Sequence, residues 1–133
     1  MKWSECRTEQ AFKMEWIRRH KKEYVALFPI ETEETVKGFP DVLGVYEIDF
    51  RKQQPCFLEF KKARNGFIHF QPTQPAFYKA NPKLFIYVVS LVEYEAKTYV
   101  VALSAELVLI KLKGTLNVDL RPFCNKENEV TGQ

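Results

Sequence analysis

The sequence predicts an α/β fold, with a mixed central sheet flanked by helices in the order α-β-β-β-α-β-β-α. Three observations support this prediction. Aromatic residues recur at helical spacing near the start, two runs rich in β-formers follow as a hairpin, and an uninterrupted apolar run comes after a short helical stretch. The 133 residues fit a single domain, 1–133, and a hydrophobic fraction of 46% with 28% charged residues excludes wholesale disorder.

The first helix is expected to run from Ser4 to Leu27. Phe12 and Trp16 lie one turn apart on one face, residues 18–22 form a basic cluster on the last turns, and Pro29 would end the helix. The segment 28–36 is predicted to be a short strand, separated from the next one by a Gly-Phe-Pro turn.

The next two strands are predicted at Val42–Phe50 and Cys56–Lys62, where β-branched and aromatic residues are frequent. The polar run between them, residues 51–55, predicts the turn of a hairpin. A turn centred there would place Asp41 opposite Arg64. A bulge at Gly44, or a twisted strand end, would then be needed to bring Asp41 to Glu59.

The second half begins with a short helix at 73–80, with Thr73 as its cap and Pro75 in its first turn. The continuous apolar run at 84–92 predicts a strand buried on both faces, and 97–103 its hairpin partner. Ser104 is expected to cap a last helix at 105–113, and the polar tail from Asn125 is expected to fray.

The three cysteines, Cys6, Cys56 and Cys124, are widely spaced and include no CxxC pair. This argues against a disulfide framework and against a cysteine zinc site, so a reducing cytoplasm is expected. No apolar run reaches the roughly 20 residues of a membrane span, and the N-terminus does not have the pattern of a secretory signal. The net charge of +3 is compatible with nucleic-acid binding.

The candidate catalytic residues are Asp41, Glu59 and Lys61. Glu59 and Lys61 lie two residues apart on a predicted strand, so their side chains share a face, while Phe60 points to the other. Asp41 stands at the start of the neighbouring strand. Two carboxylates supply hard oxygen ligands for Mg²⁺, and a lysine can orient water or stabilise negative charge. This set suits metal-assisted hydrolysis of a phosphodiester.

These residues, written Pro40-Asp41 and Glu59-x-Lys61, resemble the motif of the PD-(D/E)XK nuclease superfamily. The resemblance implies a restriction-endonuclease-like core and a Mg²⁺ site, with Mn²⁺ as a substitute. It implies Asp41, Glu59 and the Phe60 carbonyl as ligands, and Lys61 as the residue that positions water. It also implies a glutamate on the first helix that helps to bind the metal, directly or through water; Glu9 is expected in this role, with Glu15 as the alternative. A glutamine on the helix after the motif is implied too, as the residue that orients Lys61 or a phosphate; Gln74 is expected, with Gln71 as the alternative.

Within the superfamily, Gly38-Phe39-Pro40-Asp41-Val42-Leu43-Gly44 is similar to the VRR-Nuc group, and the strand at 85–90 is similar to Holliday junction resolvases of archaeal and phage type. The resolvase resemblance implies a homodimer that nicks four-way DNA junctions symmetrically in a bacterial, archaeal or phage-infected cell. The DNA contacts are then expected at Lys62, Arg64 and Arg7. A flap or nicking nuclease of VRR-Nuc type and a non-catalytic nucleic-acid-binding module are the alternatives.

Overall fold

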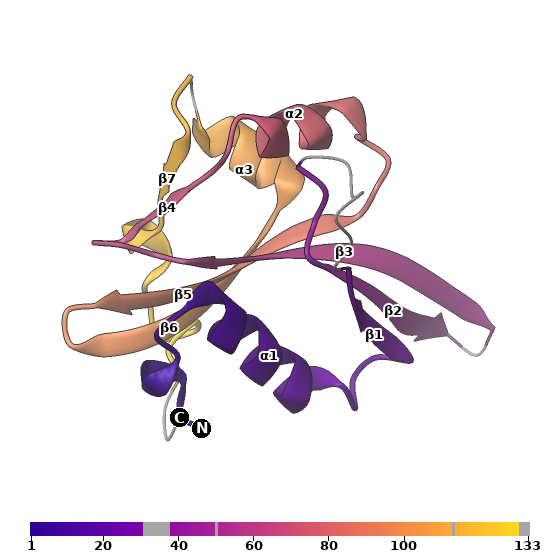
Figure 1. Cartoon of the computed structure of the whole chain (residues 1–133), viewed down its shortest axis with the longest axis horizontal. Helices are drawn as coiled ribbons and strands as arrows, with labels where there is room; N and C mark the ends of the chain where they lie inside the picture. Colours follow the sequence, from indigo (N-terminus) through magenta and orange to yellow (C-terminus); the bar gives the residue numbers. More distant parts are fainter. Residues whose placement is uncertain (31–37, 50, 113, 131–133) are drawn as a thin grey trace.

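A computed structural model describes residues 1–30, 38–49, 51–112 and 114–130. Five strands form a mixed sheet in the order β1-β2-β3-β5-β6, in which β3 and β5 are parallel and the other neighbours antiparallel. Helix α1 lies on one face, and α2 and α3 lie on the other (Figure 1). The predicted α/β class with a mixed sheet and flanking helices is therefore confirmed.

The first helix is shorter than the expected Ser4–Leu27. Helix α1 covers Glu9–His20, after a 3₁₀ turn at Trp3–Glu5. The Thr8 side chain accepts a hydrogen bond from the Ala11 N–H at 3.0 Å, and this cap fixes the start of the helix. Residues after His20 leave the helix because β1, Ala26–Pro29, pairs with β2. Residues 31–36 of the strand predicted at 28–36 lie outside the described residues.

The hairpin turn was predicted too late in the chain. Strand β2 covers Val42–Asp49 and β3 covers Lys52–Lys62, so residues 52–55 belong to the strand and not to the turn. The irregularity in the ladder lies between Glu47 and Asp49, and the predicted bulge at Gly44 is absent because Gly44 pairs regularly with Cys56.

In the second half of the chain, the four predicted elements are present with small shifts in bounds. Helix α2 covers Thr73–Ala80, β5 covers Ile86–Tyr94, β6 covers Lys97–Ser104 and α3 covers Ala105–Leu112. Pro72, and not Thr73, occupies the position before α2. Ser104 does cap α3, since its hydroxyl accepts a 3.2 Å hydrogen bond from Leu107 N–H. Two strands that were not predicted, β4 at Phe67–His69 and β7 at Asn117–Asp119, pair as a separate small sheet.

The expectation of a frayed tail is wrong for the residues described. The N–H of Val100 donates to the carbonyl of Asn128 at 3.0 Å, and the N–H of Val130 donates to the carbonyl of Thr98 at 3.0 Å. The tail therefore pairs with the outer edge of β6. Because every hydrogen-bonding group of a strand edge needs a partner, this pairing is enough to order a polar segment.

Two hydrophobic clusters lie on opposite sides of the sheet. The first joins α1 to β3, and its central contact is the side chain of Phe60 against Phe12 and Trp16. The second lies under α2 and α3 and includes Val88 and Val108. All three cysteines are free. No helix in the described ranges is long and apolar enough to cross a membrane.

Candidate active site

The ladder between β2 and β3 sets Asp41 opposite Glu59. Val42 pairs with Leu58, so the next step of the antiparallel register brings the residue before Val42 against the residue after Leu58. The Asp41 side chain is held there by the backbone, since its Oδ2 accepts a 3.0 Å hydrogen bond from the N–H of Phe60. The register irregularity that contributes to this pairing lies between Glu47 and Asp49, at the far end of the hairpin, and not at Gly44.

Alternation along β3 places the chemistry on one face and the packing on the other. The side chain of Phe60 is buried against α1, while those of Glu59 and Lys61 face α2. Both charged side chains are buried, with exposed fractions of 4% for Glu59 and 8% for Lys61. A buried pair of opposite charge with a second carboxylate beside it is costly to build, so the arrangement indicates a function.

Glu59 has a strongly raised pKa in this cluster. Burial, followed by the charge of Asp41 and a hydrogen bond with the Asp41 carboxyl, raises the pKa of Glu59 to about 9. Lys61 opposes this increase and Glu9 adds to it. The Oε1 atom of Glu59 is buried without a hydrogen-bond partner. Two adjacent carboxyl groups, one of them with a buried oxygen that lacks a hydrogen-bond partner, form a donor set that a hard cation would satisfy.

Lys61 is held in place by Gln74 on α2. Its Nζ donates a 2.9 Å hydrogen bond to Gln74 Oε1 and lies 4.9 Å from the centroid of the Phe70 ring. The same Gln74 oxygen accepts a 2.9 Å hydrogen bond from the backbone N–H of Gln71. The glutamine that meets the motif lysine is therefore Gln74, and Gln71, whose side chain is exposed, contributes only its backbone.

Gly38 brings the segment of Asp41 against the start of α2. Its φ is +88°, and a Cβ built on it would lie 2.1 Å from the carbonyl oxygen of Thr73. Only glycine allows this conformation together with so close an approach. The contact fixes α2, with Gln74 on it, relative to the strand end that carries Asp41.

Sequence reasoning missed Tyr78, which lies one helical turn after Gln74. Residues four apart on a helix share a face, and Tyr78 faces Glu59 as Gln74 faces Lys61. Burial and the charges of Glu59 and Asp41 raise the pKa of the Tyr78 hydroxyl, and this hydroxyl has no hydrogen-bond partner. The i, i+4 spacing places Tyr78 on the same helical face as Gln74, but an aromatic side chain at that spacing is also typical of a core residue.

The two candidate glutamates of α1 have different surroundings. Glu15 is buried and pairs with Arg18 and Arg19, the latter through a 2.6 Å contact between Nε and Oε2. Glu9 is exposed, and its charge acts on Glu59. Among the described residues, no three His, Cys, Asp or Glu side chains gather closely enough to hold a metal ion together. Asp41 and Glu59 are the two carboxyl groups that the hairpin brings next to each other.

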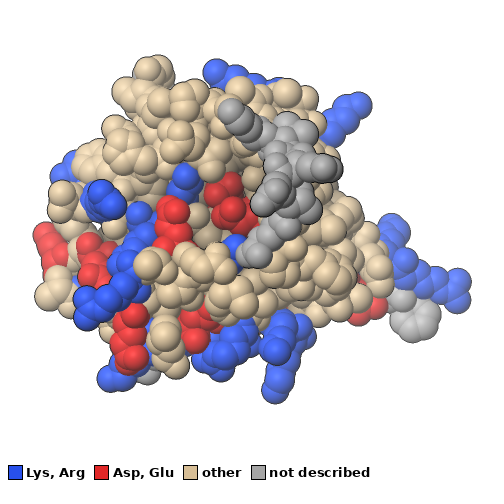
Figure 2. All heavy atoms as spheres, viewed as in Figure 1, with Lys and Arg blue, Asp and Glu red and all other residues tan. Residues whose placement is uncertain are grey.

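The three basic residues expected to contact DNA lie around the end of β3. Lys62 Nζ donates a 3.1 Å hydrogen bond to the carbonyl of Arg7, so these two residues are neighbours. Arg64 follows β3 and is exposed. Figure 2 shows acidic side chains near the middle of one face of the molecule, with lysine and arginine side chains beside them. Such a mixture combines metal-binding and phosphate-binding groups on one surface.

Comparison with known proteins assigns no family to this arrangement. No protein-family model, no curated protein and no solved structure matches the chain.

Proposed function

We propose that the protein is a metal-dependent endodeoxyribonuclease with a restriction-endonuclease-like core. The observation that carries this proposal is the register that sets Asp41 against Glu59, while Lys61 on the same strand face is held by Gln74. This is the set of residues that the sequence motif associates with phosphodiester hydrolysis.

Mg²⁺, or Mn²⁺ in its place, fits the residues present. Asp41, Glu59 and the Phe60 carbonyl would hold it, because they offer hard oxygen donors and one Glu59 oxygen has no other partner. When bound, the ion would act as a Lewis acid and offset charge on the scissile phosphate. Glu9, which is exposed, would act through water.

The chain's own residues would then do three things during hydrolysis. The ammonium group of Lys61 would orient the attacking water and stabilise the negative charge that develops on the phosphate. Gln74 would keep Lys61 in place, since its amide oxygen already accepts the Lys61 hydrogen bond. Lys62, Arg64 and Arg7 would neutralise neighbouring phosphates and fix the path of the strand.

The proposed substrate is branched DNA, with a four-way junction as the first choice. Phosphate contacts from Lys62, Arg64 and Arg7 would recognise the shape of the DNA, because contacts to the backbone carry no sequence information directly. Symmetric nicking of a junction requires two sites, so we propose a homodimer. Two sites on one particle would also add avidity on a junction that a linear duplex cannot supply. A flap or nicking activity of VRR-Nuc type is the second candidate.

A cleavage assay tests this proposal. A four-way junction, a flap and a linear duplex of equal length are incubated with the protein in Mg²⁺ and in EDTA, with sedimentation at the same concentration. We expect Mg²⁺-dependent paired nicks in the junction and a dimer. Cleavage of the flap alone would favour the second candidate. DNA binding without cleavage of any substrate would mean a non-catalytic binding module, and the nuclease proposal would fail.

A further inference from the structure

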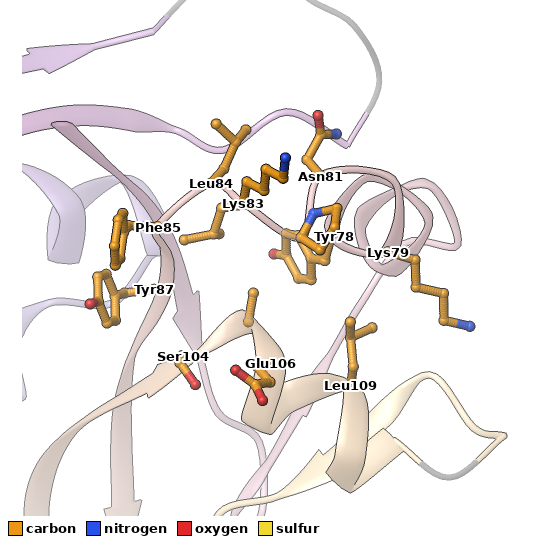
Figure 3. Close-up of a pocket in the computed structure, with 13 residues that line it drawn as sticks. Tyr78, Lys79, Asn81, Lys83, Leu84, Phe85, Tyr87, Ser104, Glu106 and Leu109 are labelled. Carbon is orange, nitrogen blue, oxygen red and sulfur yellow. The ribbon is translucent and has the colours of Figure 1, made fainter.

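A pocket lies beside the candidate active site, at the end of the sheet where β5 begins and β6 ends. It has a volume of about 790 Å³, within the range of ligand pockets. The end of α2, the segment leading into β5 and the first turns of α3 line it (Figure 3). Nothing in the proposed hydrolysis uses this space.

Tyr78 connects the pocket to the carboxylates. Its hydroxyl is acted on by the charges of Glu59 and Asp41, yet its ring also lines the pocket. In Figure 3 the ring lies among the lining side chains, with the hydroxyl directed towards Phe85 and Tyr87. The side chain is 2% exposed and its hydroxyl has no hydrogen-bond partner. Tyr78 is therefore shared between the wall of the pocket and the surroundings of the two carboxyl groups.

The walls of the pocket combine an aromatic surface with polar groups. The side chain of Phe85 is 47% exposed at the wall of the pocket. Tyr87 lies beside it (Figure 3). Asn81, Ser104 and Glu106 supply hydrogen-bonding groups on the other sides. Asn81 donates to the Phe77 carbonyl and Ser104 accepts from the Leu107 N–H, and both residues retain further hydrogen-bonding capacity for a ligand. A nucleobase suits such walls, because it offers a face for stacking and an edge for hydrogen bonds.

Two lysines of the pocket could bind the phosphates of a nucleotide. Lys79 and Lys83 belong to the lining, and both are exposed. Lys79 is directed away from the centre of the pocket, which leaves its charge for a sugar–phosphate backbone running past the opening (Figure 3). Aromatic stacking beside basic side chains is the usual composition of sites for unpaired nucleotides.

The position of the pocket relates it to the phosphate that would be cut. In the parallel ladder, Glu59 pairs with Val88 and Phe57 pairs with Ile86. Ile86 lines the pocket, so the pocket begins two strand residues from the carboxylates, about 6.6 Å along the sheet. One strand of DNA carries a phosphate about every 3.4 Å of helix axis, so the pocket lies within one or two nucleotides of the cut.

We propose that this pocket binds an unpaired nucleotide of the DNA substrate, unstacked next to the scissile phosphate, with its base against Phe85. The proposal rests on the proposed nuclease function and deepens it. It makes local loss of base pairing, as at a branch point, the feature that the protein recognises, because an already unpaired base avoids the free-energy cost of flipping.

Binding experiments with Ca²⁺ in place of Mg²⁺, to prevent cleavage, test the proposal. Wild type, Phe85→Ala, Phe85→Trp and Phe28→Ala are compared by anisotropy on a junction and on a duplex. Phe28 is the matched control, since it is 54% exposed on β1 and does not line the pocket. We expect Phe85→Ala to weaken junction binding roughly tenfold, the size of one stacking contact, and to leave duplex binding within twofold. Phe85→Trp and Phe28→Ala should bind as wild type does.

A second measurement locates the base. The cut is first mapped with wild-type protein in Mg²⁺, and 2-aminopurine is then placed at each nucleotide flanking it. We expect one position to change fluorescence with wild type and to lose that change with Phe85→Ala. If Phe85→Ala bound the junction within twofold of wild type while wild type still cut DNA, the pocket proposal would be overturned. The nuclease proposal would then stand. Conversion of the variant to a monomer would overturn the pocket proposal too, since Phe85 would then be a subunit contact. Failure of wild type to cut any DNA would overturn both proposals.

Discussion

Lys61 and Gln74 are joined by a 2.9 Å hydrogen bond between the ammonium group and the amide oxygen. The bond links the central strand β3 to α2, and the ammonium group it holds is buried. A lysine fixed in this way has a defined position before any substrate arrives. Its orientation is therefore a property of the folded chain, and changes at Gln74 should act on the chemistry through Lys61.

We expect Gln74→Ala to lower the rate constant of DNA cleavage about 10- to 100-fold while DNA affinity stays within a few-fold. Loss of the amide oxygen would leave the Lys61 ammonium group buried without its acceptor and free to rotate. Single-turnover kinetics with binding measured in Ca²⁺ would separate these effects. Gln71→Ala is the matched control, because only its backbone contacts Gln74. Equal rates for the two variants would show that Gln74 has no positioning role.

Asp41→Asn should abolish cleavage and preserve DNA binding. An amide keeps the shape of the side chain and can still accept the hydrogen bond from Phe60 N–H, but it loses the charge that a divalent cation requires. A gel assay with and without Mg²⁺ and a binding titration measure the two properties. Asp49→Asn, at the exposed far end of the same strand, is the control. Cleavage by Asp41→Asn within a few-fold of wild type would mean that Asp41 is not a ligand.

The raised pKa of Glu59 predicts that stability falls with pH when no metal is present. The folded carboxyl titrates at about 9 and the unfolded one near 4.5, so between these pH values the folded chain retains a proton that the unfolded chain has lost. In EDTA, Glu59→Gln should therefore have a higher Tm than wild type at pH 8, and the difference should vanish near pH 4.

The control for that experiment is Glu47→Gln, on the exposed end of β2, for which we expect the same Tm difference from wild type at both pH values. Mg²⁺ should raise the Tm of wild type more at pH 9 than at pH 6, because the ion competes with the proton for Glu59. A pH-independent Tm difference between Glu59→Gln and wild type would contradict the assignment of the raised pKa.

Substitution of Glu15 should affect stability, whereas substitution of Glu9 should affect Mg²⁺ binding. Arg18, with Arg19, holds the pKa of the Glu15 carboxyl down at about 2, so its stabilising effect is present above pH 4.5 and is lost as the pH falls towards 2. At pH 7, Glu15→Ala should lower the free energy of unfolding by about 1–3 kcal/mol and leave Mg²⁺ affinity unchanged. Glu9→Gln should do the reverse. Calorimetry of unfolding and of Mg²⁺ binding distinguishes them, and weaker Mg²⁺ binding by Glu15→Ala alone would reverse the assignment.

Gly38→Ala should destabilise the protein far more than Gly114→Ala. Both glycines have positive φ, +88° and +85°, but only at Gly38 would a Cβ meet backbone atoms, whereas nothing lies within 4 Å at Gly114. The difference isolates the close approach, for which we expect about 2 kcal/mol or more. For a chain of this size that is roughly 6–10 °C in Tm. Equal Tm values would show that α2 is not held at Gly38.

The sequence carried enough information for the strands but not for their register. Runs of β-branched and aromatic residues located β2, β3, β5 and β6, because such residues suit a half-buried pleated surface. The polar run at 51–55 was mistaken for the turn, since polar residues and a proline also occupy exposed ends of strands. Asp49 pairs with Lys52, so the strands are connected earlier than predicted. This earlier connection, together with the one-residue register shift between Glu47 and Asp49, moves the position opposite Asp41 from Arg64 to Glu59.

The site was predictable where it depended on local spacing and not where it depended on tertiary contacts. Alternation on β3 was sufficient to place Glu59 and Lys61 on one face. The choice between Gln71 and Gln74 required the position of α2, which Gly38 helps to fix. Tyr78 belongs to the same helical face as Gln74, but an aromatic residue on a helix is most simply explained as core, so its position near the carboxylates needed the structure.

The pairing of residues 128–130 with β6 has a consequence for how copies of this chain can associate. A chain that joins its sheets edge to edge needs a strand with vacant amide and carbonyl groups, and on β6 the stretch around Tyr99 is occupied by the molecule's own tail. Edge-to-edge pairing along the full length of β6 is thereby blocked at this stretch. A dimer formed over the tail would be built from side chains, which makes its geometry adjustable by point substitution.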